Sequence, residues 1–120
     1  MKYKSLKLKM VSDGIRQSGF VTYHDKYYYF SEKNFLMEKN VFHRIDGKLY
    51  YFRENGMALS GWLTLNGKKY YFGSDYVAYH GLKKIGKYYY YFDSDGVMLS
   101  NSYQNIDGYR YYFDASGRRK

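Results

Sequence analysis

Apolar and polar residues alternate in five short stretches of this chain, and all five follow one eleven-residue pattern. The clearest copy covers residues 62–72 and reads WLTLNGKKYYF. Four further copies occupy residues 20–30, 42–52, 82–92 and 103–113 without a gap. Their closing phenylalanines lie 22, 20, 20 and 21 residues apart, and a period of about 20 residues is typical of a repeat array.

The middle of each copy predicts a tight turn between two strands. Three copies carry a two-residue hairpin signal, namely Asp46-Gly47, Asn66-Gly67 and Asp107-Gly108. A type I′ turn requires positive φ at both central residues, which Asn, Asp and Gly tolerate best. In residues 62–72 this turn pairs Leu65 with Lys68 and Trp62 with Tyr71. Each copy is therefore predicted to be a β-hairpin whose side chains alternate between two faces.

The two faces differ in how much they change from copy to copy. The nearly uniform face carries Tyr23, Ile45, Leu65, Ile85 and Ile106 at position four, Tyr28, Tyr50, Tyr70, Tyr90 and Tyr111 at position nine, and the five closing phenylalanines. The varying face carries Phe20, Phe42, Trp62, Leu82 and Tyr103 at position one, and Tyr27, Leu49, Lys69, Tyr89 and Arg110 at position eight. We interpret the uniform face as the core and the varying face as the candidate ligand surface.

A hairpin that buries one face needs a neighbour, because isolated two-stranded hairpins are marginally stable. We therefore expect an all-β fold, a β-solenoid of stacked two-stranded hairpins, and a single repeat domain over residues 1–120. Residues 1–19 align as a partial capping repeat without its first strand, with Met10 in the place of a closing phenylalanine. The turns after the hairpins hold Gly56, Gly96 and Gly117, whereas Tyr76 occupies the same place and must be extended or strained.

The pattern G-W-x(4)-G-K-x-Y-Y-F resembles the cell-wall-binding repeat superfamily of Gram-positive bacteria and their phages. That superfamily includes choline-binding modules, glucan-binding repeats of streptococcal glucosyltransferases and the C-terminal repeats of large clostridial toxins. Residues 61–75 are most similar to the toxin repeats, and the resemblance covers residues 6–117. It implies a solenoid of hairpins with ligands in shallow aromatic grooves between successive hairpins.

The resemblance also implies where a choline site would lie. Choline-binding members surround the cation with the tryptophan after Gly, a second tryptophan at position eight and a tyrosine of the next hairpin. The corresponding residues are Phe20, Tyr27 and Tyr51 after the first copy, and Leu82, Tyr89 and Tyr112 after the fourth. Position eight is Leu49, Lys69 or Arg110 in the other copies, and a cation there repels choline where an aromatic ring attracts it.

Composition narrows the classes of partner. The chain has a formal net charge of +9, which favours anionic polymers such as teichoic acid, although the same charge also serves solubility. Basic and aromatic residues alternate as in nucleic-acid-binding proteins, but no motif supports that class. The sequence contains no cysteine, no run of about 20 apolar residues and no apolar signal core at its start. A secreted or cell-wall-associated protein would need an export signal outside these residues.

No catalytic or metal-binding motif stands out. The sequence lacks a nucleophile elbow, a zinc-protease motif and a phosphate-binding glycine loop, so we expect no enzyme activity and no cofactor. Asp93-Ser94-Asp95-Gly96 starts like a calcium loop but lacks the later ligands. His24, His43 and His80 lie in different repeats without ligand spacing, so we expect them to be exposed or to pack on the hairpins.

These observations favour a non-catalytic carbohydrate-binding repeat module that attaches a secreted bacterial protein to a glycan. The glycan would be a cell-wall polysaccharide, a glucan or a host oligosaccharide. The candidate ligand-binding residues are Phe20, Tyr27, Tyr51, Trp62, Lys69, Tyr71, Tyr89, Tyr91, Tyr103, Arg110 and Tyr112. The alternatives are a choline-binding or teichoic-acid-binding anchor and a purely structural spacer or assembly solenoid.

Overall fold

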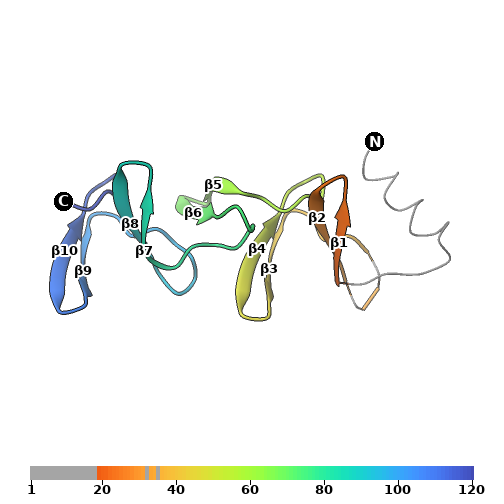
Figure 1. The fold of residues 1–120 in the computed structure, drawn as a ribbon, viewed down its shortest axis with the longest axis horizontal. Helices are drawn as coiled ribbons and strands as arrows, with labels where there is room; N and C mark the ends of the chain where they lie inside the picture. The colour runs from red at the N-terminus through yellow and green to blue at the C-terminus, as the bar shows by residue number, and fades with distance from the viewer. Residues whose placement is uncertain (1–18, 32, 35) are drawn as a thin grey trace. The chain divides into compact units, whose positions relative to one another are not determined.

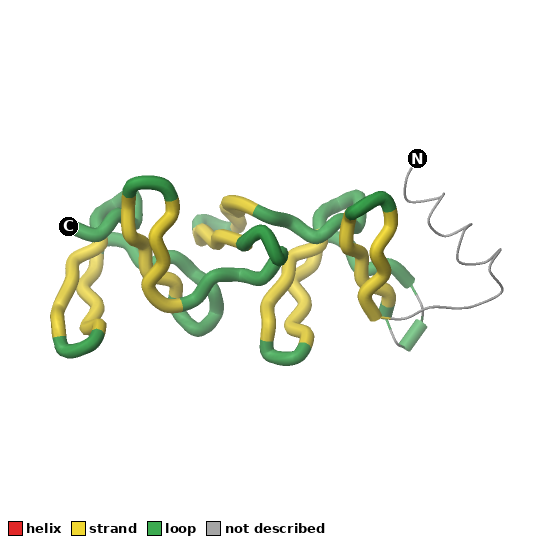
Figure 2. The backbone as a smooth tube through the Cα atoms, in the orientation of Figure 1, coloured by secondary structure: helices red, strands yellow, loops and turns green. Residues whose placement is uncertain are grey.

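Five antiparallel hairpins make up the described part of the chain. The computed structural model describes residues 19–31, 33, 34 and 36–120. The strands are β1 (Gly19–Tyr23), β2 (Lys26–Phe30), β3 (Val41–Ile45), β4 (Lys48–Phe52), β5 (Gly61–Leu65), β6 (Lys68–Phe72), β7 (Gly81–Ile85), β8 (Tyr88–Phe92), β9 (Ser102–Ile106) and β10 (Tyr109–Phe113) (Figure 1). Strands and loops account for all of these residues, and no helix long and apolar enough to cross a membrane occurs among them (Figure 2). The predicted cap, apart from Gly19, lies outside the described residues.

The turns follow the sequence signals. Asn66 has φ 52° and Gly67 has φ 76°, which is the predicted left-handed pair, and the Asp-Gly turns of the second and fifth hairpins repeat it. Strand pairing joins Leu65 to Lys68 and Trp62 to Tyr71, so the predicted register is confirmed. The register also assigns the two faces, because paired residues point to the same side.

A short third segment completes each hairpin. The closing phenylalanines pair with single residues of the following linker, in the bridges Phe30–Met37, Phe52–Ala58, Phe72–Ala78, Phe92–Met98 and Phe113–Arg119. Five residues separate the two sides of the bridge in four copies and six in the first copy, and in the third copy Tyr76 donates its N–H to Gly73 O at 2.9 Å. Tyr76 has φ 68°, so of the two expected outcomes the strained one is found.

The hairpins fall into two compact units. Residues up to Leu59 form the N-terminal unit with β1–β4, and residues from Ser60 form the C-terminal unit with β5–β10. Within the N-terminal unit, the N–H of Ala58 donates to Tyr27 O in the preceding hairpin at 2.9 Å. The C-terminal unit repeats this bond twice, from Met98 to Lys69 O and from Arg119 to Tyr89 O. One backbone hydrogen bond therefore ties each linker to the position-eight carbonyl of the preceding hairpin in the same unit.

Close approach of backbone and side chain accompanies these bonds. Gly117 follows the last hairpin, and a Cβ atom added to it would collide with the thioether of Met98 from the preceding repeat. Gly56 lies against Met37 in the same way within the N-terminal unit. Glycine at this turn therefore provides space for the neighbouring linker as well as positive φ.

The uniform face forms the core, as predicted. The five closing phenylalanines are at most 1% exposed, and Tyr28, Tyr50, Tyr70 and Tyr90 are also buried. Leu65 and its counterparts at position four are half-buried. The first hairpin departs from the pattern, because Tyr29 of the varying face is buried too. Its ring contacts Phe20, His43 and Phe52.

The core assignment predicts unequal effects of two substitutions in β6. Phe72→Ala should lower the free energy of unfolding of the C-terminal unit by about 3–5 kcal/mol, because it removes a fully buried ring. Lys69→Ala changes an exposed side chain and should leave stability nearly unchanged. Denaturant unfolding followed by the fluorescence of Trp62 measures both, and equal losses would show that the faces are misassigned.

Candidate functional site

Three equivalent clusters lie between successive hairpins within the units. Each contains the residue at position one, the residue at position eight, the position-nine tyrosine of the next hairpin and the linker residue that bonds the position-eight carbonyl. We call them the first cluster (Phe20, Tyr27, Tyr50, Ala58), the second cluster (Trp62, Lys69, Tyr90, Met98) and the third cluster (Leu82, Tyr89, Tyr111, Arg119). The hydrogen bonds of Ala58, Met98 and Arg119 show that the three linker residues are equivalent.

The first cluster consists of uncharged side chains. The ring of Phe20 is 42% exposed and lies 4.9 Å from the ring of Tyr50 in the next hairpin and 6.2 Å from that of Tyr27. The sequence placed Tyr51 here, but the ring of Tyr51 contacts Phe42 at 4.9 Å instead. Adjacent residues of a strand point to opposite faces, so only one of Tyr50 and Tyr51 can face Phe20.

The second cluster combines an exposed indole with a cation. Trp62 is 43% exposed, and edge contacts join its ring to Tyr71 at 5.0 Å and to Tyr90 of the next hairpin at 5.2 Å. Lys69 is exposed and pairs with Thr64 on the face that carries Trp62. The predicted candidates Trp62, Lys69 and Tyr71 therefore share one face, where aromatic and polar groups lie beside one another.

The third cluster has no aromatic residue at position one and a cation inside. Leu82 is half-buried, while the guanidinium carbon of Arg119 lies 4.4 Å from the ring centre of Tyr89 and 4.7 Å from that of Tyr111. Tyr112, which the sequence placed beside Tyr89, contacts Tyr103 within the last hairpin. Tyr91 is half-buried, and its ring lies 6.1 Å from that of Phe113.

The last hairpin carries its own stacked cation. Tyr103 is 56% exposed, and the guanidinium of Arg110 lies 4.1 Å from its ring centre. Both were predicted as ligand-binding residues, and the structure brings them together on one face. Arg110 therefore covers part of the Tyr103 ring.

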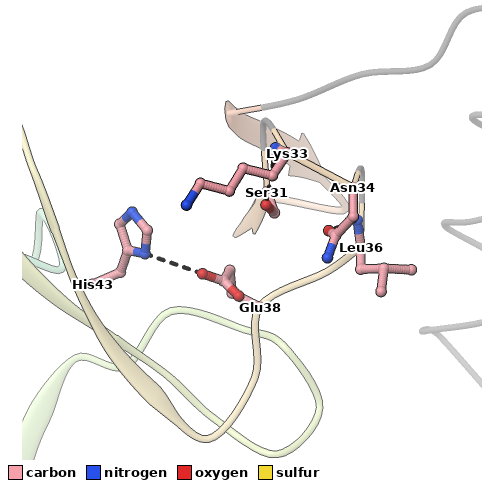
Figure 3. A network of polar contacts seen from close by, with 6 residues as sticks. All are labelled: Ser31, Lys33, Asn34, Leu36, Glu38 and His43. Carbon is pink, nitrogen blue, oxygen red and sulfur yellow. Dashed lines mark hydrogen bonds and ion pairs between the residues drawn. The ribbon is translucent and has the colours of Figure 1, made fainter.

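The histidine of β3 lies against the side of the first hairpin. His43 Nδ1 is 3.1 Å from Glu38 Oε1, and the imidazole ring lies 4.6 Å from the ring of Tyr29 (Figure 3). In the neighbouring turn, Asn34 Oδ1 accepts a hydrogen bond from the N–H of Leu36. Among the residues that the structure describes, no three potential metal ligands lie together.

The pKa values of Tyr70 and Asp114 shift in opposite directions. Burial raises the pKa of the Tyr70 hydroxyl, and the nearby charges of Asp93 and Asp95 raise it further, so this core tyrosine stays neutral. Desolvation acts against ionisation of Asp114, but hydrogen bonds from the N–H groups of Arg118 and Ser116 outweigh it and lower the pKa of the carboxyl. Both bonds are 2.9 Å long and end on Asp114 Oδ1, so this acidic residue orders the turn.

Two members of each cluster, the position-nine tyrosine and the linker residue, were not predicted as site residues from the sequence. The position-nine tyrosines were assigned to the core alone, yet Tyr50 and Tyr90 contact the position-one ring of the preceding hairpin. Linker residues such as Arg119 carried no motif. Their regular place six residues after the closing phenylalanine, seen in four of the five bridges, was the available signal.

The lowered pKa of Asp114 predicts a pH dependence of stability. Because the carboxyl titrates below its ordinary value of 3.8 in the folded chain, its contribution is complete above that pH and is lost as the pH falls through the folded pKa. The midpoint of thermal unfolding, followed by Trp62 fluorescence from neutral to strongly acidic solution, should fall at the acid end less steeply in Asp114→Asn. An unchanged acid slope in this variant would contradict the assignment, since Asn keeps an acceptor oxygen without the charge.

Two repeat families match most of the chain. A putative cell wall binding repeat matches residues 18–33, 42–56 and 60–75, and a choline-binding repeat matches residues 79–119. No curated protein sequence gives a significant match. The two families together cover all five hairpins.

Solved structures of choline-binding proteins also resemble this chain. Choline binding protein F from Streptococcus pneumoniae, crystallised in the presence of a peptidoglycan analogue, is 27% identical with a TM-score of 0.75, over 87% of this chain and 34% of that one. Its crystal form II gives 26% identity and a TM-score of 0.74, with 87% and 35% of the two chains covered. The choline-binding domain of CbpL from the same organism is 26% identical with a TM-score of 0.71, over 87% of this chain and 56% of that one.

The chain thus spans about a third of choline binding protein F and little more than half of the CbpL domain. These likenesses confirm the predicted fold class of stacked β-hairpin repeats. Together with the family matches, they show that this chain belongs to the choline-binding type of the cell-wall-binding repeat superfamily.

Proposed function

We propose that the chain is a non-catalytic module that attaches its parent protein to a polymer of the bacterial cell wall. One observation carries the proposal. In both units an exposed position-one ring is braced by a buried tyrosine of the next hairpin, Phe20 by Tyr50 and Trp62 by Tyr90. A fixed ring with an exposed surface can bind a ligand without the entropic cost of ordering it first. The cell-wall context of the relatives supports a secreted, wall-associated parent protein.

The second cluster favours a glycan. The indole of Trp62 is nearly half exposed, so it offers a broad apolar surface for the face of a sugar ring. Thr64 and Lys69 are exposed on the same face and can form hydrogen bonds with hydroxyl groups or an anionic substituent. The ammonium of Lys69 opposes a quaternary ammonium ligand at this cluster.

Repetition compensates for weak single sites. A shallow surface made of one ring and a few polar groups buries little of its ligand, so each contact alone should have low affinity. A polymer that reaches more than one hairpin converts later contacts into intramolecular events and raises the overall affinity. The anionic polymers of the wall would gain further from the formal net charge of +9.

The glycan proposal is tested at Trp62, the only tryptophan of the chain. Titration with a peptidoglycan tetrasaccharide should shift its fluorescence emission, and Trp62→Ala should weaken binding about tenfold, equal to about 1.4 kcal/mol. Because Trp62 also contacts Tyr90 and Phe92, the alanine variant should lose some stability. Trp62→Phe is the matched control, since Phe occupies this position in the first two hairpins and keeps a ring on the next hairpin.

The outcomes are distinct. Weaker binding in Trp62→Ala, with the β-sheet spectrum retained and partial recovery in Trp62→Phe, supports a sugar on the indole. If the tetrasaccharide binds while neither the emission nor the affinity of the alanine variant changes, the glycan site lies elsewhere. If no glycan of the wall binds, the proposal for this cluster is wrong.

The first cluster favours a second candidate, recognition of choline or a related quaternary ammonium. Phe20, Tyr27 and Tyr50 place three rings together, and their linker residue is the small Ala58. Aromatic faces attract a quaternary ammonium, and choline on teichoic acid would be a wall-bound source of one. The family model of choline-binding repeats matches other hairpins, residues 79–119, so this candidate rests on the geometry of the rings.

This candidate predicts weak choline binding confined to the N-terminal unit. Phe20→Ala should lower the affinity for choline about tenfold, because a desolvated cation–π contact contributes up to about 2 kcal/mol. Tyr103→Ala removes a ring beside which Arg110 already places a cation, so it should leave the affinity for choline unchanged. Nuclear magnetic resonance titration of the tyrosine rings measures both, and equal effects of the two substitutions would exclude the first cluster.

A further inference from the structure

Arg119 contacts two tyrosine rings from two different hairpins at once. Its guanidinium carbon lies 4.4 Å from the ring centre of Tyr89 in β8 and 4.7 Å from that of Tyr111 in β10. Both distances are well within the range of about 6 Å in which a cation gains from an aromatic face. The side chain is half-buried, so solvent screens these contacts only in part.

The backbone fixes Arg119 at this place. Its N–H donates to Tyr89 O at 2.9 Å, and Arg119 also forms an isolated β-bridge with Phe113. Ala58 and Met98 make the same hydrogen bond in the first and second clusters. The position therefore accepts a small, a flexible apolar or a charged side chain on an unchanged backbone, and the side chain alone determines what lies between the rings.

A planar guanidinium suits this environment better than other cations. It is more weakly hydrated than an ammonium and stacks on aromatic faces, so it loses less hydration energy between two rings. Lys84 Nζ lies farther from the ring centre of Tyr89, at 5.8 Å, while the guanidinium carbon of Arg118 lies 4.1 Å from the ring centre of Tyr88, which points to the other face of β8. Asp114 contributes a carboxylate to the following turn, where it accepts the N–H of Arg118.

We propose that Arg119 is the chain's own ligand for Tyr89 and Tyr111. The third cluster is then a cation-binding site filled from within, which clamps β9–β10 onto β7–β8 and excludes external quaternary ammonium ions. This inference does not depend on which wall polymer the other clusters bind. The clusters then differ in role although their backbones are the same. The first and second clusters are open to ligands, whereas the third cluster holds two hairpins together.

The direct test measures the chemical shifts of the Arg119 side chain. In nuclear magnetic resonance spectra of the full chain, ring currents from two tyrosines should displace the Nε–H and Cδ–H signals of Arg119 upfield. Tyr89→Leu and Tyr111→Leu should each remove part of the displacement. Arg44, whose guanidinium bonds Gly47 O in the turn after β3, is the reference signal. An Arg119 signal at ordinary positions would overturn the proposal.

The second test measures whether removal of the Arg119 side chain lets an external quaternary ammonium ion bind between Tyr89 and Tyr111. Lys84 Nζ lies 5.8 Å from the ring centre of Tyr89 and would itself repel an external cation, so the test is made in a Lys84→Met background. Tetramethylammonium should leave the ring signals of Tyr89 and Tyr111 unchanged when Arg119 is present and shift them saturably in Arg119→Ala. The substitution installs the residue found at the equivalent place of the first cluster, so the backbone tolerates it. Equal shifts in the two proteins, or no shift in either, would overturn the proposal.

The clamp also predicts a stability difference between two arginines. Arg119→Ala should lower the thermal unfolding midpoint of the C-terminal unit more than Arg110→Ala, because Arg119 bridges two hairpins while Arg110 covers Tyr103 within one. Arg119→Met installs the residue found at the equivalent place of the second cluster, so it separates charge from volume and should recover only part of the loss. Equal midpoints for Arg119→Ala and Arg110→Ala would show that Arg119 does not join the hairpins.

Discussion

Every feature of this chain depends on the fact that a two-stranded hairpin has a buried face but no second layer to cover it. Phe52, Phe92 and Phe113 are fully buried because residues of the following linker pair with them and rings of the preceding hairpin in the same unit lie beside them. A backbone hydrogen bond from linker to preceding hairpin, such as Ala58 to Tyr27 O, fixes this arrangement in each unit. Stability therefore belongs to pairs of repeats, as expected for a solenoid, and not to the single hairpin.

This constraint gives the position-one ring two roles. Phe20 and Trp62 begin the varying face of their own hairpins, yet each contacts the core tyrosine and phenylalanine of the next hairpin. The ring is thus held by packing on one side and exposed on the other. Packing and ligand binding are not alternatives for these side chains, because the contacts that stabilise the array also orient the exposed surface.

Much of the fold could be predicted from local sequence. The Asn66-Gly67 turn determines the register, and the register with strand alternation determines which side chains share a face. The neighbour of each ring could not be predicted in this way. The rotation from one hairpin to the next decides whether Tyr50 or Tyr51 faces Phe20, and no pattern within a single repeat encodes that rotation. The contacts of Arg119 could not be predicted for the same reason, since its two partner rings belong to different hairpins.

The placement of cations then separates the clusters chemically while the backbone stays the same. Phe20 lies beside the rings of Tyr27 and Tyr50, Lys69 shares the face of Trp62, and Arg119 lies between Tyr89 and Tyr111. A cation beside a ring favours hydroxyl groups or anions, whereas a cation on the ring occupies the surface that another cation would need. If the clusters bind ligands as we propose, the ligand class of each cluster depends on two positions, position eight of the hairpin and the linker residue bonded to its carbonyl. Because neither position carries the fold, an array of this kind can hold different ligands along one chain without altering its core.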